Sequence, residues 1–298
     1  MSRSQIYIGL AAMGFSFILI FSTALKNSGM SSFEQLFFRL SFGGLIVLAI
    51  LFWRKESWSF RRKDVRFFVA IGSIYSLFTL SGMSSIAFGT PIAVAVALIY
   101  TQPLFTAIIS FATGKEEITW LRLCVIFLGV SGVFFLTGQQ IISMEIDLGI
   151  VLPVLAGLFY ALYLWLKRQA GAAHEYTPFQ VLLNTFLIAI PFLLVVWLIL
   201  GNLMVIPLFV GFSIPELGQL LLLIGFAAFS TVLPYSMLNF VKPEEISPTS
   251  EGLLLLGDPL LHSLWAILFF DQYVTPVQYI GAALILLSAA ISLKFSSG

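Results

Sequence analysis

The ionisable residues Glu251, Asp258 and His262 lie within one long apolar stretch, Ser247–Asp271. Their spacing places them, together with Trp265, on one face of a helix. If this helix crosses a bilayer, a rise of about 1.5 Å per residue puts Asp258 roughly 15 Å deep, near the middle of the hydrocarbon core. An ionisable side chain at that depth is costly and usually faces a bundle interior or a watery cavity. Asp258 is therefore a candidate acceptor for a proton or for a substrate ammonium group.

Each of these residues also has a structural interpretation. Asp258 could bond to a serine or asparagine of a neighbouring helix, and Glu251, only roughly 5 Å deep, could simply be in contact with water. His262 is better explained as a hydrogen-bonded bundle residue than as a metal ligand, because no second histidine or cysteine stands at ligand spacing. We therefore predict no metal site and no cofactor.

Two of the predicted helices carry a proline beside polar residues. Pro259 removes one backbone donor, so we expect a strained turn and a freed carbonyl at Leu255. Pro103 holds the matching place in an earlier helix, where the surrounding polar groups are neutral. These neutral candidates are Tyr100, Gln102 and Thr106. Both prolines are predicted hinges, and charge chemistry is predicted to belong to the later helix.

Other predicted helices offer polar side chains to the same interior. Candidates for lining a solute cavity are Ser76 and Thr79 in the third predicted helix and Tyr235 and Asn239 in the eighth. Ordinary packing by small residues explains the third helix equally well.

Arg39 lies inside the second predicted helix, roughly 10 Å from its outer end and too deep to reach water comfortably. Its acceptors could be a substrate carboxylate, the carbonyls at a helix end, or Glu34. A buried cation that serves only the fold is at least as good an explanation.

The composition is that of a polytopic membrane protein. Of the 298 residues, 59% are hydrophobic and 10% are charged, and the mean hydropathy is +1.03, whereas soluble proteins carry about 25% charged residues. A net charge of +1 gives no indication of nucleic-acid binding. The single cysteine, Cys124, excludes an intramolecular disulfide.

Apolar runs of spanning length predict an all-α membrane protein with ten transmembrane helices. The expected spans are Ser4–Ala24, Ser32–Trp53, Val65–Ile86, Pro91–Ala112, Thr119–Gly138, Leu148–Leu166, Pro178–Leu200, Glu216–Phe240, Pro248–Phe269 and Pro276–Leu293. With the N-terminus inside, the basic loop residues fall on the cytoplasmic side and only Lys26 lies outside. We therefore predict that both termini are cytoplasmic.

An internal repeat divides the chain. The segment Ile99–Gly132 aligns with Leu255–Ser288, so that Pro103 meets Pro259. We predict a first five-helix repeat over residues 1–140 and a second over residues 141–298, together forming one transmembrane domain. Because five is an odd number, the two repeats must be inverted relative to each other, and such repeats place the substrate site near the midplane.

The chain resembles the EamA-type proteins of the drug/metabolite transporter superfamily over its whole length. The resemblance rests on the double repeat, on the intramembrane Arg39 and on an ordered motif in the second half. That motif reads Asp258-Pro259, Asp271, Thr275, Gln278 and Ile280-Gly281. The first half departs from it, with Gln102 in place of an acidic residue and Val125 in place of glycine. The resemblance implies solute transport, usually the export of amino acids or other small metabolites.

We therefore expect a secondary transporter or facilitator of a small metabolite, such as an amino acid, in the cell membrane of a prokaryote. Alternating access through a central cavity would move the solute, and Asp258 is the candidate for proton coupling. The absence of a GxxxxGK[ST] motif argues against an ATP-driven pump. An intramembrane enzyme or a receptor that does not transport is the alternative, although two histidines and one cysteine provide no convincing catalytic set. Expected partners are the solute and lipid, with no nucleic acid, in a monomer or homodimer.

Overall fold

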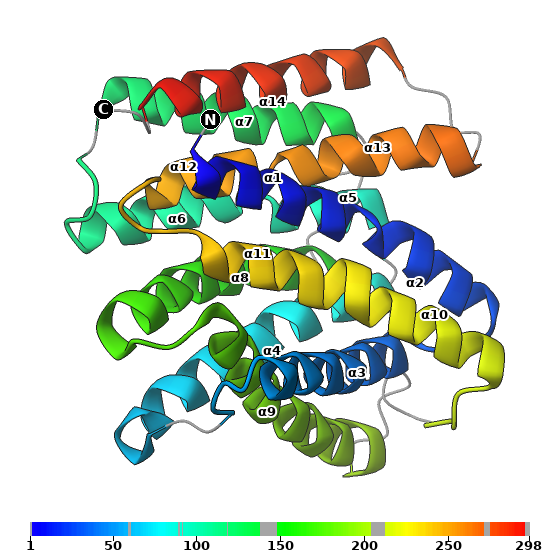
Figure 1. Cartoon of the computed structure of the whole chain (residues 1–298). Helices are drawn as coiled ribbons and strands as arrows, with labels where there is room; N and C mark the ends of the chain where they lie inside the picture. The colour runs from blue at the N-terminus through cyan, green and yellow to red at the C-terminus, as the bar shows by residue number, and fades with distance from the viewer. Residues whose placement is uncertain are drawn as a thin grey trace.

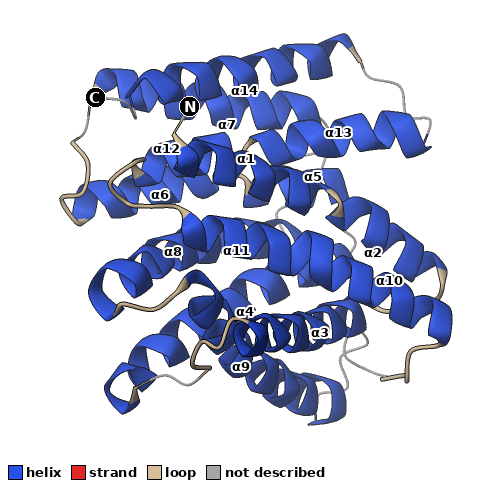
Figure 2. Ribbon diagram, in the orientation of Figure 1, coloured by secondary structure: helices blue, strands red, loops and turns tan. Residues whose placement is uncertain are grey.

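The computed structural model describes residues 2–58, 61–88, 90, 92–117, 119–137, 148–203, 212–270 and 275–295. All regular elements in these ranges are helical, as Figure 2 shows. In chain order the α-helices are α1 (Arg3–Ser16), α2 (Ile18–Asn27), α3 (Ser32–Trp53), α4 (Val65–Ala87), α5 (Ile92–Ile99), α6 (Gln102–Ala112), α7 (Trp120–Thr137), α8 (Leu148–His174), α9 (Pro178–Val196), α10 (Leu217–Ala227), α11 (Leu233–Phe240), α12 (Pro248–Leu254), α13 (Gly257–Phe270) and α14 (Pro276–Phe295).

Short helical segments of other types join some of these helices. A 3-10 turn (Arg62–Asp64) precedes α4, a π-helix (Trp197–Leu203) extends α9, and a second π-helix (Ala228–Val232) connects α10 to α11. Among the described residues, nine continuous helical runs are long and apolar enough to cross a membrane, and the run Trp120–Leu136 is a shorter apolar helix. These runs match the ten expected spans within a few residues, apart from the sixth.

Local sequence explains where several helices begin. Ser2, Ser31 and Thr177 each cap a helix, and in every case the residue three positions later completes a capping box. Such a box satisfies backbone donors that the first helical turn leaves without partners.

The sixth predicted span is wrong at its end. We expected a loop from Lys167, but α8 continues to His174. The continuation is possible because Lys167 and Arg168 find a buried carboxylate, so these charges need not leave the bundle for water.

Contacts between loops define the two ends of the bundle. At one end, the Tyr176 hydroxyl receives a hydrogen bond from the Arg61 amide at 2.9 Å. The Glu245 carboxylate likewise receives a hydrogen bond from the Ser4 amide at 3.0 Å. The end of α14 lies at this same end as the start of α1 (Figure 1). At the opposite end, the Gln219 side chain donates to the Ser28 carbonyl.

Close packing joins α7 to α14, which lie side by side in Figure 1. A Cβ atom added at Gly132 would lie 2.8 Å from the carbonyl oxygen of Gly281. The Ser288 hydroxyl donates to the Val125 carbonyl across the same contact, at 2.9 Å. Glycine is required here because only its bare backbone permits the two helices to approach this closely.

Candidate functional site

Two broken helices position the central polar residues. The helix pair α12–α13 is interrupted at Leu255 and Leu256, and α5–α6 is interrupted at Tyr100 and Thr101. Each break precedes one of the predicted hinge prolines, Pro259 or Pro103. Our expectation of a freed carbonyl at Leu255 is wrong, because that oxygen accepts the Asp258 amide at 3.0 Å. The Leu255 carbonyl therefore keeps a hydrogen-bond partner at the break, and the side chains beside the break face the interior of the bundle.

Asp258 bridges the two breaks. Its carboxylate accepts a hydrogen bond from the Tyr100 hydroxyl, so a side chain of the first break contacts a side chain of the second. The other carboxylate oxygen lies 2.9 Å from Nδ1 of His262, which forms an ion pair when the imidazole is protonated. Asp258 is only 4% exposed. Tyr100, Asp258 and His262 thus form one group of side chains in direct polar contact.

This group lies in the wall of a cavity of about 200 Å³. Most of the wall is apolar or aromatic, with a few charged and hydroxyl groups, which is typical of small-molecule sites. The lining residues are Phe15, Ile18, Ser22, Thr23, Lys26, Arg39, Phe78, Thr79, Gly82, Met83, Val96, Ile99, Tyr100, Tyr160, Tyr235, Asp258 and His262. The cavity therefore extends from the broken helices to Lys26, which is exposed at the end of α2.

Arg39 contributes a charge of the opposite sign to this wall. It is 5% exposed, and its guanidinium carbon lies 4.9 Å from the centroid of the Phe226 ring. Glu34, the partner that we considered from sequence, is engaged elsewhere. Its carboxylate accepts hydrogen bonds from the amides of Ser31 and Ser213 and from the Ser213 hydroxyl.

Three buried tyrosines pack against one another beside the cavity. The ring centroids of Tyr75 and Tyr163 lie 5.3 Å apart, and those of Tyr75 and Tyr235 lie 5.0 Å apart. All three side chains are buried, and Tyr235 also lines the cavity.

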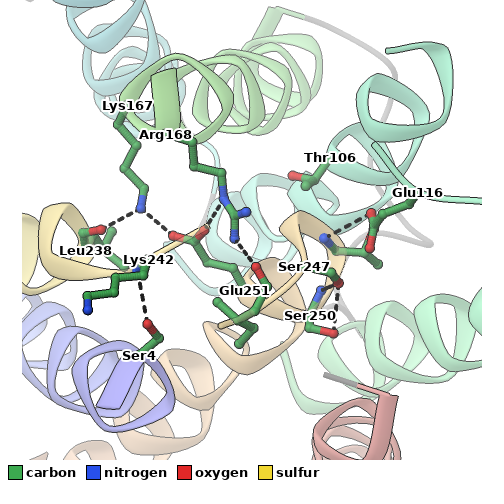
Figure 3. Close-up of polar contacts among 12 residues, drawn as sticks. Ser4, Thr106, Glu116, Lys167, Arg168, Leu238, Lys242, Ser247, Ser250 and Glu251 are labelled. Carbon is green, nitrogen blue, oxygen red and sulfur yellow. Dashed lines mark hydrogen bonds and ion pairs between the residues drawn. The ribbon is translucent and has the colours of Figure 1, made fainter. Parts of the chain in front are cut away.

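A buried ionic cluster lies one helical turn beyond the tyrosines, where Figure 3 shows two cations of α8 converging on Glu251 of α12. Lys167 Nζ lies 2.6 Å and Arg168 Nε 2.9 Å from the two carboxylate oxygens of Glu251. Lys167 also donates to the Leu238 carbonyl of α11, and Arg168 donates to the Ile246 carbonyl. Of the two interpretations that we gave for Glu251, simple contact with water is wrong. It is 1% exposed, because α8 supplies its counter-charges.

Several candidates that we predicted from sequence lie outside the cavity wall and bond to other groups. Gln102 donates to Thr106, and the Ser76 hydroxyl donates to the Gly72 carbonyl at 2.9 Å. Asn239 donates to the Pro178 carbonyl, and the Trp265 indole donates to the Ser16 hydroxyl at 2.8 Å. Glu251 belongs to the ionic cluster. Tyr100, Thr79, Tyr235, Arg39, Asp258 and His262 are the candidates that the structure brings together around the cavity.

Part of the cavity wall was not predicted from the sequence. Ser22 and Thr23 of α2 and the aromatic residues Phe15 and Phe78 line the cavity without having been candidates. The adjacent hydroxyls of Ser22 and Thr23 in an apolar run were the one available signal. Among the described residues, no group of three or more potential metal ligands occurs.

An all-helical bundle of this length, apolar on its outside and enclosing a charged cavity, is a multi-pass membrane protein built like a transporter. The model of the EamA-like transporter family matches residues 3–138 and 147–294, and the chain belongs to this family.

Individual proteins agree with that assignment. The threonine/homoserine exporter RhtA of Escherichia coli (strain K12) is 27% identical over 283 residues, covering 90% of this chain and 88% of the exporter. An uncharacterised transporter of Archaeoglobus fulgidus is 24% identical over 290 residues, covering 95% of this chain and 96% of the archaeal protein. A solved crystal structure with a TM-score of 0.80 and 16% identity covers 100% of this chain and 98% of its own, which supports the fold alone. The protein is thus a multi-pass cell-membrane transporter of small metabolites.

Proposed function

We propose that this protein exports a small amino acid or a similar metabolite by alternating access through the central cavity. The observation that carries the proposal is a cavity lined by Arg39 and Asp258 that reaches the exposed Lys26. We assign the closure of its other end to the layer of three tyrosines and the ionic cluster. In alternating access the cavity is open to only one side of the membrane in each of the two conformations, so a cavity closed at one end fits this mechanism. The name of the E. coli relative, a threonine/homoserine exporter, favours small hydroxylated amino acids as the first solutes to test.

We assign the orientation of the protein in the membrane from the positions of its basic loops and from its two repeats. The end that holds Arg61, Tyr176 and Ser4 carries the basic loops, so we assign it, with both termini, to the cytoplasm. The family model matches the chain twice, which supports two inverted repeats over residues 1–140 and 141–298. The closed end would then be the cytoplasmic one. Rocking of the halves about the breaks at Pro103 and Pro259 would open it.

Asp258 is the residue that we assign to proton coupling. When it is ionised it accepts the Tyr100 hydroxyl and can pair with His262, and when it is protonated the ion pair is lost. Tyr100 and Asp258 belong to different halves of the chain. Protonation would therefore weaken a contact between the two halves and couple the charge of one side chain to their relative movement.

Purified protein in proteoliposomes tests this function directly. We expect exchange of radiolabelled L-threonine or L-homoserine without chemical change. Asp258→Asn should flatten the dependence of transport on pH while leaving the melting temperature within a few degrees of the wild type. A chemically altered solute would indicate an enzyme, and binding without exchange would indicate a receptor. An unchanged pH profile in Asp258→Asn would refute the proton role alone.

A further inference from the structure

Arg39 is a buried cation, and no carboxylate of the described residues lies in ion-pair contact with it. Within the described part of the chain it makes no hydrogen bond and no ion pair, and its Nε atom has no acceptor. The Phe226 ring, 4.9 Å from the guanidinium carbon, attracts the positive charge but leaves the planar N–H donors unused. A guanidinium that is 5% exposed is costly to bury unless an acceptor completes it.

The acidic residues around Arg39 are already committed. Glu34, on the same helix, is held by Ser31 and Ser213. Asp258, in the same cavity, is held by Tyr100 and His262. The described residues thus provide no carboxylate partner for Arg39, and the cavity beside it is where the carboxylate of a solute can enter.

We propose that Arg39 binds the carboxylate of the transported solute and thereby selects for solutes that carry one. The planar fork of arginine matches the two oxygens of a carboxylate, and the hydrogen bonds are strengthened by charge. Lys26, the other cation of the lining, lies at the exposed end of the cavity and attracts the same group during binding or release. The inference rests on the proposed function. It assigns Arg39 a role in binding, whereas from the sequence a cation that serves only the fold was at least as good an explanation.

The arrangement also assigns the other end of the solute. Each Asp258 carboxylate oxygen keeps a lone pair beside its contact with Tyr100 or His262, so this residue of the cavity wall suits an ammonium group, whereas Arg39 suits an anion. A small zwitterion satisfies both residues without adding net charge to the interior. The solute class is thus an α-amino acid held by charge at both ends, with the aromatic residues of the wall around its side chain.

Three related probes separate these contributions in the wild-type protein. L-Threonine carries both charges, L-threoninamide lacks the carboxylate, and 3-hydroxybutyrate lacks the ammonium group. We expect ligand-induced thermal stabilisation by threonine, with affinity for threoninamide weaker by about ten-fold or more because the charge-assisted bonds to Arg39 are lost. Equal affinity for threonine and threoninamide, or no stabilisation by either carboxylate-bearing probe, would overturn the inference.

Variants localise the effect to one side chain. Arg39→Gln should lower the affinity for threonine to that for threoninamide, and Arg39→Lys should recover part of the difference. Arg66→Gln, an exposed arginine of α4, is the matched control and should bind as the wild type does. If Arg39→Gln does not fold, the comparison of probes on the wild type still decides. If the Arg39→Gln protein exchanges threonine and binds it as tightly as the wild type does, the carboxylate site is refuted but the transport function is not. If the wild type exchanges none of the probes, the transport function itself is refuted.

Discussion

The ammonium nitrogen of Lys167 lies 2.6 Å from a carboxylate oxygen of Glu251, and each of the two side chains is 1% exposed. Arg168 approaches the other oxygen of the same carboxylate at 2.9 Å. One buried anion thus compensates two cations that belong to adjacent positions of α8. The cluster joins α8 to α12 and, through the Leu238 carbonyl, to α11.

Removing this anion should destabilise the protein. In Glu251→Gln both cations remain buried without a counter-charge, and breaking a buried pair in this way costs about 3 kcal/mol or more. We expect a clearly lowered melting temperature in purified protein. Glu244→Gln, the same substitution at an exposed position of the connection before α12, should leave the melting temperature unchanged. Equal melting temperatures for the two variants would show that the cluster contributes nothing to stability.

The same cluster should control access from its end of the bundle. Ser110 is buried beside a cavity of about 10 Å³ that Glu251 also lines. In a Cys124→Ser background, Ser110→Cys should react slowly with a membrane-impermeant thiol reagent, and adding Glu251→Gln should accelerate the reaction. Thr113→Cys, exposed at the end of α6, should react at the same rate in both backgrounds. If Ser110→Cys stays unreactive when Glu251→Gln is added, the ionic cluster does not close this end of the bundle.

The contact between α7 and α14 should tolerate no side chain at its centre. A Cβ atom at Gly281 would lie 2.5 Å from the backbone nitrogen of Leu136 and 2.6 Å from the Gly132 carbonyl oxygen. Gly281→Ala must therefore push the helices apart, and overpacking of this kind costs about 1–3 kcal/mol.

A second glycine in a helix provides the control. Gly218 of α10 has nothing within 4 Å of its would-be Cβ atom, so Gly218→Ala should keep or raise stability because alanine favours the helix by up to about 1 kcal/mol. Thermal melting of both variants is the measurement. A neutral Gly281→Ala would contradict the observed closeness of the two backbones.

Glu245 predicts one component of the pH dependence of stability. The Ser4 backbone amide and then its hydroxyl, together with the charge of Lys242, hold the pKa of this carboxyl below its ordinary value near 4.5. Because the pKa is lower in the folded state, the stabilisation is present above about pH 4.5 and is lost as the pH falls through the folded-state pKa. The difference in melting temperature between the wild type and Glu245→Gln should therefore shrink from pH 6 towards pH 4. A difference that stays constant over this range would exclude the contribution.

Much of the architecture was predictable because membrane insertion depends on local composition. A run of apolar residues must span the bilayer as a helix wherever it occurs, so the spans and the breaks near Pro103 and Pro259 follow from short stretches of sequence. The same counting predicted that Asp258 lies inside the bundle, where it is 4% exposed. The end of α8 did not, because it depends on Glu251, a residue 83 positions further along the chain than Arg168.

The sequence by itself thus determined that this is a multi-helix membrane protein with a buried acid in its later half. Only the tertiary structure decided which charges meet. It paired Asp258 with Tyr100, gave Glu251 to Lys167 and Arg168, and left Arg39 in the cavity wall with no carboxylate partner among the described residues. The physical reason is that the energy of a buried charge depends on the groups within a few ångströms of it, and packing brings those groups from distant parts of the chain.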